Sequence, residues 1–237
     1  PEEMVSYVHD NNSKLMISIW ANFGPWTDQY RELDKIGALL PFETWPRNRG
    51  VRPYDPFNPK ARDIYWKYLT NLYKMGIDAW WTDSTEPDHF EAPGDADYMT
   101  HDGSWRSVKN AFALMTNKGI YEHQRKMKGN NRRSVQMTRC GTFGLQHYGT
   151  FRSGDVVSNW NVMKNQIPSG LNYVICGIPF WNTDIGGFFG WDYKNDPKSP
   201  AMQELQVRWM QWGCFMPMMR NHCSSPMVSE LYNFGNP

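Results

Sequence analysis

Residues 58–83 read NPKARDIYWKYLTNLYKMGIDAWWTD, and this stretch decides the fold. Asn58 predicts a helix N-cap, Pro59 suits the first helical position, and Gly76 predicts the helix stop. Between them, apolar residues recur at helical spacing and give the helix one buried face. Residues 77–82 (IDAWWT) are a short apolar run that predicts a buried strand. The stretch is therefore a helix followed by a strand that ends at Asp83.

The same alternation continues along the rest of the chain. Alternating strands and helices predict a parallel sheet with helical crossovers. The segment 91–104 is rich in Asp and Gly and is expected to be a long loop. Strands are predicted at 15–20, 134–140, 150–152, 173–178 and 215–219, and helices at 108–126, 156–166 and 199–212.

Polar or ionisable residues follow nearly every predicted strand, namely Asp83, Arg139, Asp155, Asp184 and His222. A doubly wound sheet would bind its ligand at one switch point, usually with a Gly-rich phosphate loop, and neither phosphate-loop pattern occurs here. A (β/α)₈ TIM barrel instead draws its site from the carboxyl ends of all its strands. The sequence therefore predicts an α/β fold of the TIM-barrel type, incomplete, with about six of the eight strand–helix units present.

Composition excludes several classes of function. The formal net charge of +1 gives no electrostatic reason to bind nucleic acid or an anionic membrane. No apolar run approaches the roughly 18 residues that a membrane span needs. The four cysteines form no C-x-x-C pair, so a zinc site is not expected. Their thiols are expected to be free and buried. The 12 Trp, 12 Tyr and 12 Phe residues fit an aromatic core or a sugar site equally well.

Two carboxylates at strand ends suggest a chemistry. Asp83 follows Trp80 and Trp81, and Asp155 follows a very short predicted strand. Each could instead cap a following helix. Cleavage of a glycoside needs such a pair, because one carboxylate attacks the anomeric carbon while the other protonates the leaving oxygen.

Five segments resemble glycoside hydrolase family 31. Residues 80–88 (WWTDSTEPD) resemble its W-x-D-M-N-E nucleophile signature, with Glu86 at the downstream carboxylate. Arg139, residues 141–144 (GTFG) and 153–155 (SGD) resemble the R-S-x-F-x-G…W-x-G-D segment. The other matches are 167–172 (IPSGLN), 181–188 (WNTDIGGF) and 215–222 (FMPMMRNH), the last similar to F-x-P-x-x-R-x-H.

The resemblance implies a retaining, exo-acting α-glycosidase that removes terminal xylose, glucose or galactose from oligosaccharides and needs no metal or cofactor. Asp83 would be the nucleophile and Asp155 the acid/base. Arg139 would steady the charges, while Asp184 and His222 would hold sugar hydroxyls. The remaining residues expected to bind substrate are Trp20, Trp81, Arg152, Trp181 and Phe188, of which Trp20 and Trp181 could instead be core.

The chain departs from the family pattern in two ways. Arg152 stands where the family usually has a Trp, which could alter specificity or mark a degenerate site. An upstream β-sandwich, the first barrel strands and C-terminal β-domains are also missing. Residues 1–237 are therefore expected to be part of one catalytic barrel that the rest of a parent polypeptide completes. The alternatives are a non-catalytic carbohydrate-binding remnant and a purely structural piece.

Overall fold

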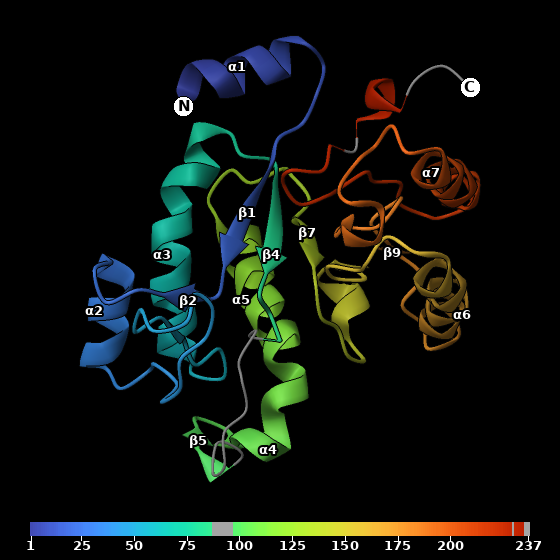
Figure 1. The fold of residues 1–237 in the computed structure, drawn as a ribbon. Coiled ribbons are helices and arrows are strands. Elements are labelled where there is room, and N and C mark those ends of the chain that lie inside the picture. Colours follow the sequence, from blue (N-terminus) through green and yellow to red (C-terminus); the bar gives the residue numbers. More distant parts are fainter. Residues whose placement is uncertain (87–96, 229, 235–237) are drawn as a thin grey trace. The chain divides into compact units, whose positions relative to one another are not determined.

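The chain is described by a computed structural model that covers residues 1–86, 97–228 and 230–234 (Figure 1). It consists of two compact units, Pro1–Gly149 and Thr150–Pro237. The described residues contain five parallel strands of the barrel type, three in the first unit and two in the second, where the sequence predicts six. None of the described helices is both long and apolar enough to span a bilayer.

The first unit is built on three parallel strands in the order β1 (Met16–Trp20), β4 (Ala79–Asp83) and β7 (Val135–Thr138). Helices α3 (Pro59–Met75) and α5 (Phe112–Lys126) connect them and lie beside them in Figure 1. These three strands confirm the predicted ones, each shortened by one to three residues.

Helix α3 begins and ends where its sequence predicts. The Asn58 side chain accepts a hydrogen bond from the backbone N–H of Lys60 at 3.0 Å. Gly76 ends the helix with a left-handed φ of 114°, and a Cβ there would lie 2.9 Å from Val5. A side chain at this position would therefore be strained by its backbone and by its neighbour.

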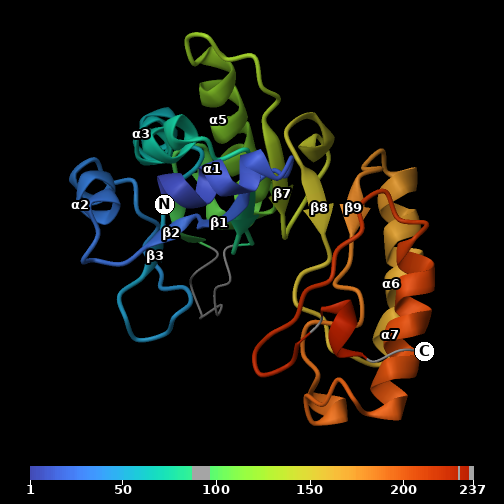
Figure 2. The ribbon, with the colours of Figure 1, turned by 90° about the horizontal axis from the view of Figure 1, so that it is seen from above.

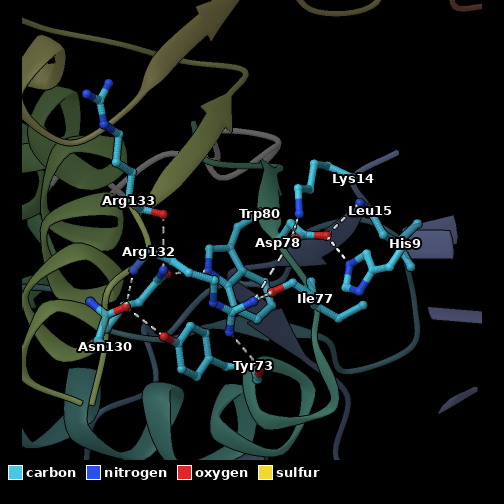
Figure 3. A network of polar contacts seen from close by, with 11 residues as sticks. His9, Lys14, Leu15, Tyr73, Ile77, Asp78, Trp80, Asn130, Arg132 and Arg133 are labelled. Atoms are coloured by element: carbon cyan, nitrogen blue, oxygen red, sulfur yellow. Dashed lines mark hydrogen bonds and ion pairs between the residues drawn. The ribbon is translucent and has the colours of Figure 1, made fainter. Parts of the chain in front are cut away.

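The first strand pair is tied together at the end opposite Asp83 (Figure 3). Asp78 precedes β4 and accepts hydrogen bonds from the Leu15 N–H at 2.9 Å and from His9 Nε2 at 2.7 Å. Arg132 contacts the same carboxylate at 3.9 Å. Although burial raises the pKa of Asp78, the bonds from Leu15 and His9 hold this pKa below its ordinary value. This network belongs to the stabilising end of the strands.

Several short elements between the strands were not predicted. A two-stranded antiparallel pair and a helix precede α3, and a small hairpin precedes α5. Residues 91–96 of the expected loop lie outside the described residues. The helix predicted at 108–126 is divided into three consecutive helices. These elements are β2 (Asn22–Phe23), α2 (Asp28–Lys35), β3 (Arg52–Pro53), β5 (Met99–Thr100), β6 (Gly103–Ser104), α4 (Trp105–Val108) and the 3₁₀ helices Lys109–Ala111 and Leu145–His147. Helix α1 (Glu2–Asp10) precedes β1.

The second unit pairs β8 (Thr150–Arg152) with β9 (Trp181–Asn182) in parallel, so that Arg152 is level with Asn182. Helices α6 (Trp160–Ile175) and α7 (Pro200–Gly213) contribute to one apolar cluster, and both run along the same side of the unit in Figure 2. Strand β8 and helix α7 confirm their predictions. Short 3₁₀ helices lie at Trp191–Tyr193 and Leu231–Asn233.

Two of the predicted strands are wrong, as is the predicted end of one helix. Residues 173–175 belong to α6, which starts after an Asn159 cap and runs through Pro168. Gly170 inside this helix packs against the Trp181 ring, and such tertiary packing overrides the stop signals of the local sequence. Residues 215–219 form no strand, and Phe215 is 89% exposed.

The cysteines are free, as predicted, but burial was overestimated. Cys176 and Cys214 are exposed, because each directly follows a helix, α6 or α7.

Candidate active site

The predicted site residues divide between the two units. Those of the first unit are Trp20, Trp81, Asp83 and Arg139. Those of the second unit are Arg152, Asp155, Trp181, Asp184, Phe188 and His222.

The pleat of β4 decides which way Asp83 faces. Trp80 donates its indole N–H to Gln124 of α5 at 3.0 Å, and Thr82 contacts Asn117 of the same helix. Because side chains alternate along a strand, Trp81 and Asp83 lie on the face directed away from these helices. The parallel register then places Trp20 of β1 level with Asp83.

A strained turn fixes the Asp83 carboxylate. Ser84 has a φ of 53°, and its backbone N–H donates to Asp83 Oδ1 at 2.8 Å. Such a conformation costs a non-glycine residue roughly 1–3 kcal/mol and persists only where the surroundings enforce it. Here they do, because Ser84 and Thr85 are buried and the Thr85 and Thr138 hydroxyls lie 2.7 Å apart. Backbone strain of this kind concentrates at functional sites.

Arg139 lies between two carboxylates. Its Nε is 3.5 Å from Asp83 Oδ1, and its guanidinium group also forms an ion pair with Glu86. The register explains the first contact, since Thr82 of β4 is level with Thr138 of β7 and the next residue on each strand is Asp83 and Arg139. We name Asp83, Glu86 and Arg139 the first cluster. Its side chains are 17%, 37% and 12% exposed, so all three reach solvent.

Arg152 ends β8 and is fully buried. It donates from Nη1 to Asp155 Oδ1 at 3.1 Å, while the Asp155 side chain remains 28% exposed. The intervening loop is fixed to β9, because the Ser153 N–H donates to the Asn182 carbonyl at 2.9 Å. Gly154 turns the chain with a φ of 83°, which returns Asp155 toward the arginine.

Asp184 follows β9 and has no exposed surface. Its Oδ1 forms an ion pair with Arg220, whose Nε donates to Asn182 Oδ1 at 2.9 Å. Burial raises the pKa of Asp184 to about 6, and the nearby charges of Arg220 and Arg152 oppose that rise. Burial likewise lowers the pKa of Arg220. We name Asp184 and Arg220 the second cluster.

A double-glycine turn brings Phe188 to His222. Gly186 and Gly187 both have a φ of 87°, and a Cβ on Gly187 would lie 2.5 Å from Ser158 Cα. Only glycine fits both the backbone angle and this close approach. Beyond the turn, the rings of Phe188 and His222 lie 4.9 Å apart at an angle of 36°. The structure thus brings together these two predicted residues.

Trp181 packs differently from the other predicted residues. It is buried against Gly170 and against Trp212, whose ring centroid lies 5.9 Å away. It also lines an apolar groove with residues of α6 and with Phe215, and no charged side chain lines that groove. This packing favours the core alternative for Trp181.

Sequence reasoning missed the residues that support the carboxylates. Ser84 carries the strain beside Asp83, and a serine gives no local signal for a positive φ. Asn182 and Arg220 hold Asp184, and only the F-x-P-x-x-R-x-H resemblance pointed to Arg220. Within the described part of the chain, no group of three or more His, Cys, Asp or Glu residues is placed to hold a metal ion.

Comparison with known proteins gives consistent results. Residues 1–237 match the family model described as the TIM-barrel domain of glycosyl hydrolases family 31. An α-xylosidase from Saccharolobus solfataricus is 36% identical over 229 residues, which are 94% of this chain and 29% of that protein. The chain therefore spans less than a third of this relative's length.

Two solved structures extend the likeness to three dimensions. A family 31 α-xylosidase from Xanthomonas citri superposes with a TM-score of 0.88 at 33% identity, over 99% of this chain and 27% of that one. A Flavobacterium johnsoniae family 31 dextranase in complex with glucose gives a TM-score of 0.89 at 30% identity, over 100% and 30%.

Proposed function

The chain belongs to glycosyl hydrolase family 31, and on that premise we propose that it carries the catalytic residues of a retaining, exo-acting α-glycosidase. The observation that carries the proposal is the ordered carboxylate at the end of β4. Asp83 faces away from the covering helices, accepts a bond from a strained Ser84 and lies beside Arg139. A nucleophile must be held in this manner before its substrate arrives.

In the first step, Asp83 attacks the anomeric carbon and the glycosidic bond breaks. Asp155 gives its proton to the departing oxygen, and a covalent β-glycosyl-enzyme forms. In the second step, Asp155 takes a proton from water as that water attacks the same carbon. The sugar leaves with its α configuration, Asp83 is a free carboxylate again, and Asp155 is again protonated.

The second cluster is proposed to bind the terminal sugar. Among the described residues, no donor meets Asp184 Oδ2, although this atom is fully buried. A buried carboxylate oxygen of that kind is a strong acceptor for a sugar hydroxyl. His222 offers a ring nitrogen for a second hydroxyl and is oriented by its contact with Phe188.

We propose a terminal α-xyloside as the first substrate to test and an α-glucoside as the second. The support is the names of the relatives, which include α-xylosidases and an α-glucosidase. The activity is that of the complete natural polypeptide, because this chain spans only 27–30% of the solved relatives described above. We further propose that residues 1–237 form part of one barrel that the remainder of that polypeptide completes.

The test is covalent trapping. The complete polypeptide is incubated with 5-fluoro-α-xylosyl fluoride or 5-fluoro-α-glucosyl fluoride, and the labelled peptide is identified by mass spectrometry. We expect a single adduct on Asp83. Asp83→Asn should remain unlabelled, whereas Asp155→Asn should still be labelled, since fluoride leaves without a proton donor. A chain that binds xylose or glucose without forming an adduct would instead be a carbohydrate-binding remnant.

A further inference from the structure

Arg152 is a buried cation in the second unit, at a position where the family resemblance leads one to expect an aromatic residue. It has no exposed surface, and its Nη1 donates to Asp155 Oδ1 at 3.1 Å. A buried guanidinium is costly unless opposite charge compensates it. The carboxylate of Asp155 supplies this opposite charge, and the ion pair holds the two side chains together.

The backbone leaves this arginine little freedom. Arg152 is level with Asn182 of β9, and the N–H of the next residue, Ser153, donates to the Asn182 carbonyl. The Ser153 hydroxyl lies 3.3 Å from that of Thr183. The Arg152 side chain is also fully buried, which restricts its N–H donors, whereas Asp155 lies beyond a glycine turn and is partly open to solvent. The contact therefore fixes the carboxylate rather than the arginine.

Arg152 and its neighbour Arg220 form ion pairs with different carboxylates. Arg220 forms its ion pair with Asp184. Arg152 favours the ionised form of Asp184 from a distance, and Asp155 opposes it. The two arginines thus share one set of carboxylates, and Arg152 is the one whose Nη1 donates to Asp155 Oδ1.

We propose that Arg152 is a positioning residue that orients the Asp155 carboxyl group for proton transfer, an inference that rests on the acid/base role proposed above for Asp155. A proton donor must lie within hydrogen-bond reach of the leaving oxygen, and a loss of alignment reduces its contribution. An indole at position 152 has a single N–H and no charge. The usual aromatic residue therefore cannot orient Asp155 through an ion pair, whereas Arg152 can.

The experiment compares two leaving groups in the complete natural polypeptide. α-Xylosyl fluoride needs no proton donor, whereas the disaccharide α-xylosyl-(1→6)-glucose does; α-glucosyl fluoride and isomaltose form the matching pair for an α-glucosidase. We expect Arg152→Met to lose on the order of 10²-fold more kcat/KM on the disaccharide than on the fluoride. Arg152→Lys should recover part of that difference, because it restores a charge without the fixed planar donor.

Arg220→Met is the matched control, because it removes the other arginine near Asp184 and leaves the hydrogen bond from Arg152 to Asp155 in place. It should reduce kcat/KM on both substrates by similar factors. In an Asp155→Ala background, Arg152→Met should cost less than about threefold on the disaccharide, since residues that act through one another are not additive.

Equal losses on the two substrates in Arg152→Met, or full additivity with Asp155→Ala, would overturn the proposal. Should Arg152→Met fail to fold, Arg152→Lys carries the test, with a difference of at least about tenfold expected between the substrates. If Asp155→Ala itself treats both substrates alike, the acid/base assignment fails. If Asp155→Ala distinguishes them and the Arg152 variants do not, only the positioning role fails.

Discussion

The first and second clusters are both arginine–carboxylate contacts at strand ends, yet they differ in environment. Every member of the first cluster reaches solvent, with Glu86 the most open at 37%. In the second cluster Asp184 has no exposed surface, whereas Arg220 is 14% exposed, much like Arg139 at 12%. Solvent therefore reaches the carboxylates of the first cluster but not the carboxylate of Asp184, whose charge depends on its protein partners. The ion pair of the second cluster should therefore contribute more to the stability of the fold than the ion pairs of the first.

The largest effect expected is on turnover, at Asp83. Asp83→Asn in the complete polypeptide should reduce kcat by at least about 10⁴-fold, as removal of a covalent nucleophile does. The free energy of unfolding should change by less than about 1 kcal/mol, since the site stays hydrated. Steady-state kinetics and urea unfolding measure the two quantities. Retention of more than 1% of the wild-type kcat would refute the nucleophile assignment.

The next effect is on stability, at Asp184. Asp184→Ala should lower the free energy of unfolding by about 3–5 kcal/mol, because it leaves Arg220 buried without its partner. The double variant Asp184→Leu, Arg220→Met is the control, and it should recover most of that loss. Urea titration followed by tryptophan fluorescence is the measurement. A loss below 1 kcal/mol in Asp184→Ala would erase the contrast between the clusters.

The same residue predicts a pH dependence. The pKa of Asp184 is raised from 3.8 to about 6 in the folded chain, so the folded state holds this proton more tightly than the unfolded state does. The contribution is full below about pH 4 and is lost as the pH rises through 6, a difference of about 3 kcal/mol. Asp184→Asn should remove that dependence. Identical pH–stability curves for the wild type and this variant would show that folding does not raise the pKa of Asp184.

The smallest effect is expected at Glu86. Its partly open ion pair with Arg139 is worth at most about 1 kcal/mol, so Glu86→Gln should lower the free energy of unfolding by no more than that. The difference between wild type and variant should shrink further in 0.5 M NaCl, because salt screens exposed charges. A loss as large as that of Asp184→Ala would place the first cluster in the same class as the second.

Local sequence signals predicted those elements whose ends carry a capping residue, a proline, a glycine or a polar residue. Asn58, Pro59 and Gly76 fixed α3, and the apolar runs before Asp83 and Arg139 fixed β4 and β7. These strand ends also identified the candidate carboxylate and its arginine, and the structure brings the two together. Their catalytic roles remain predictions.

Local sequence signals failed where residues far apart in the chain determine the structure. Pro168 and Gly170 indicated a helix stop, but a tryptophan from β9 fills the space beside the helix and the helix continues. The ion pair of Asp184 and Arg220 joins residues 36 positions apart, and no spacing rule in a single sequence pairs them. The strain at Ser84 likewise arises from its burial and from the contact of the next residue, Thr85, with Thr138, and not from the preference of a serine.

The contact between Gly170 and Trp181 limits how this chain can diverge. A Cβ at position 170 would lie 1.5 Å from a carbon of the indole ring, so even alanine cannot be accommodated while the tryptophan stays in place. The constraint runs in one direction, because a larger residue in the helix requires a smaller one on the strand. Among descendants of this sequence, a lineage should therefore replace Gly170 only after, or together with, a smaller residue at position 181.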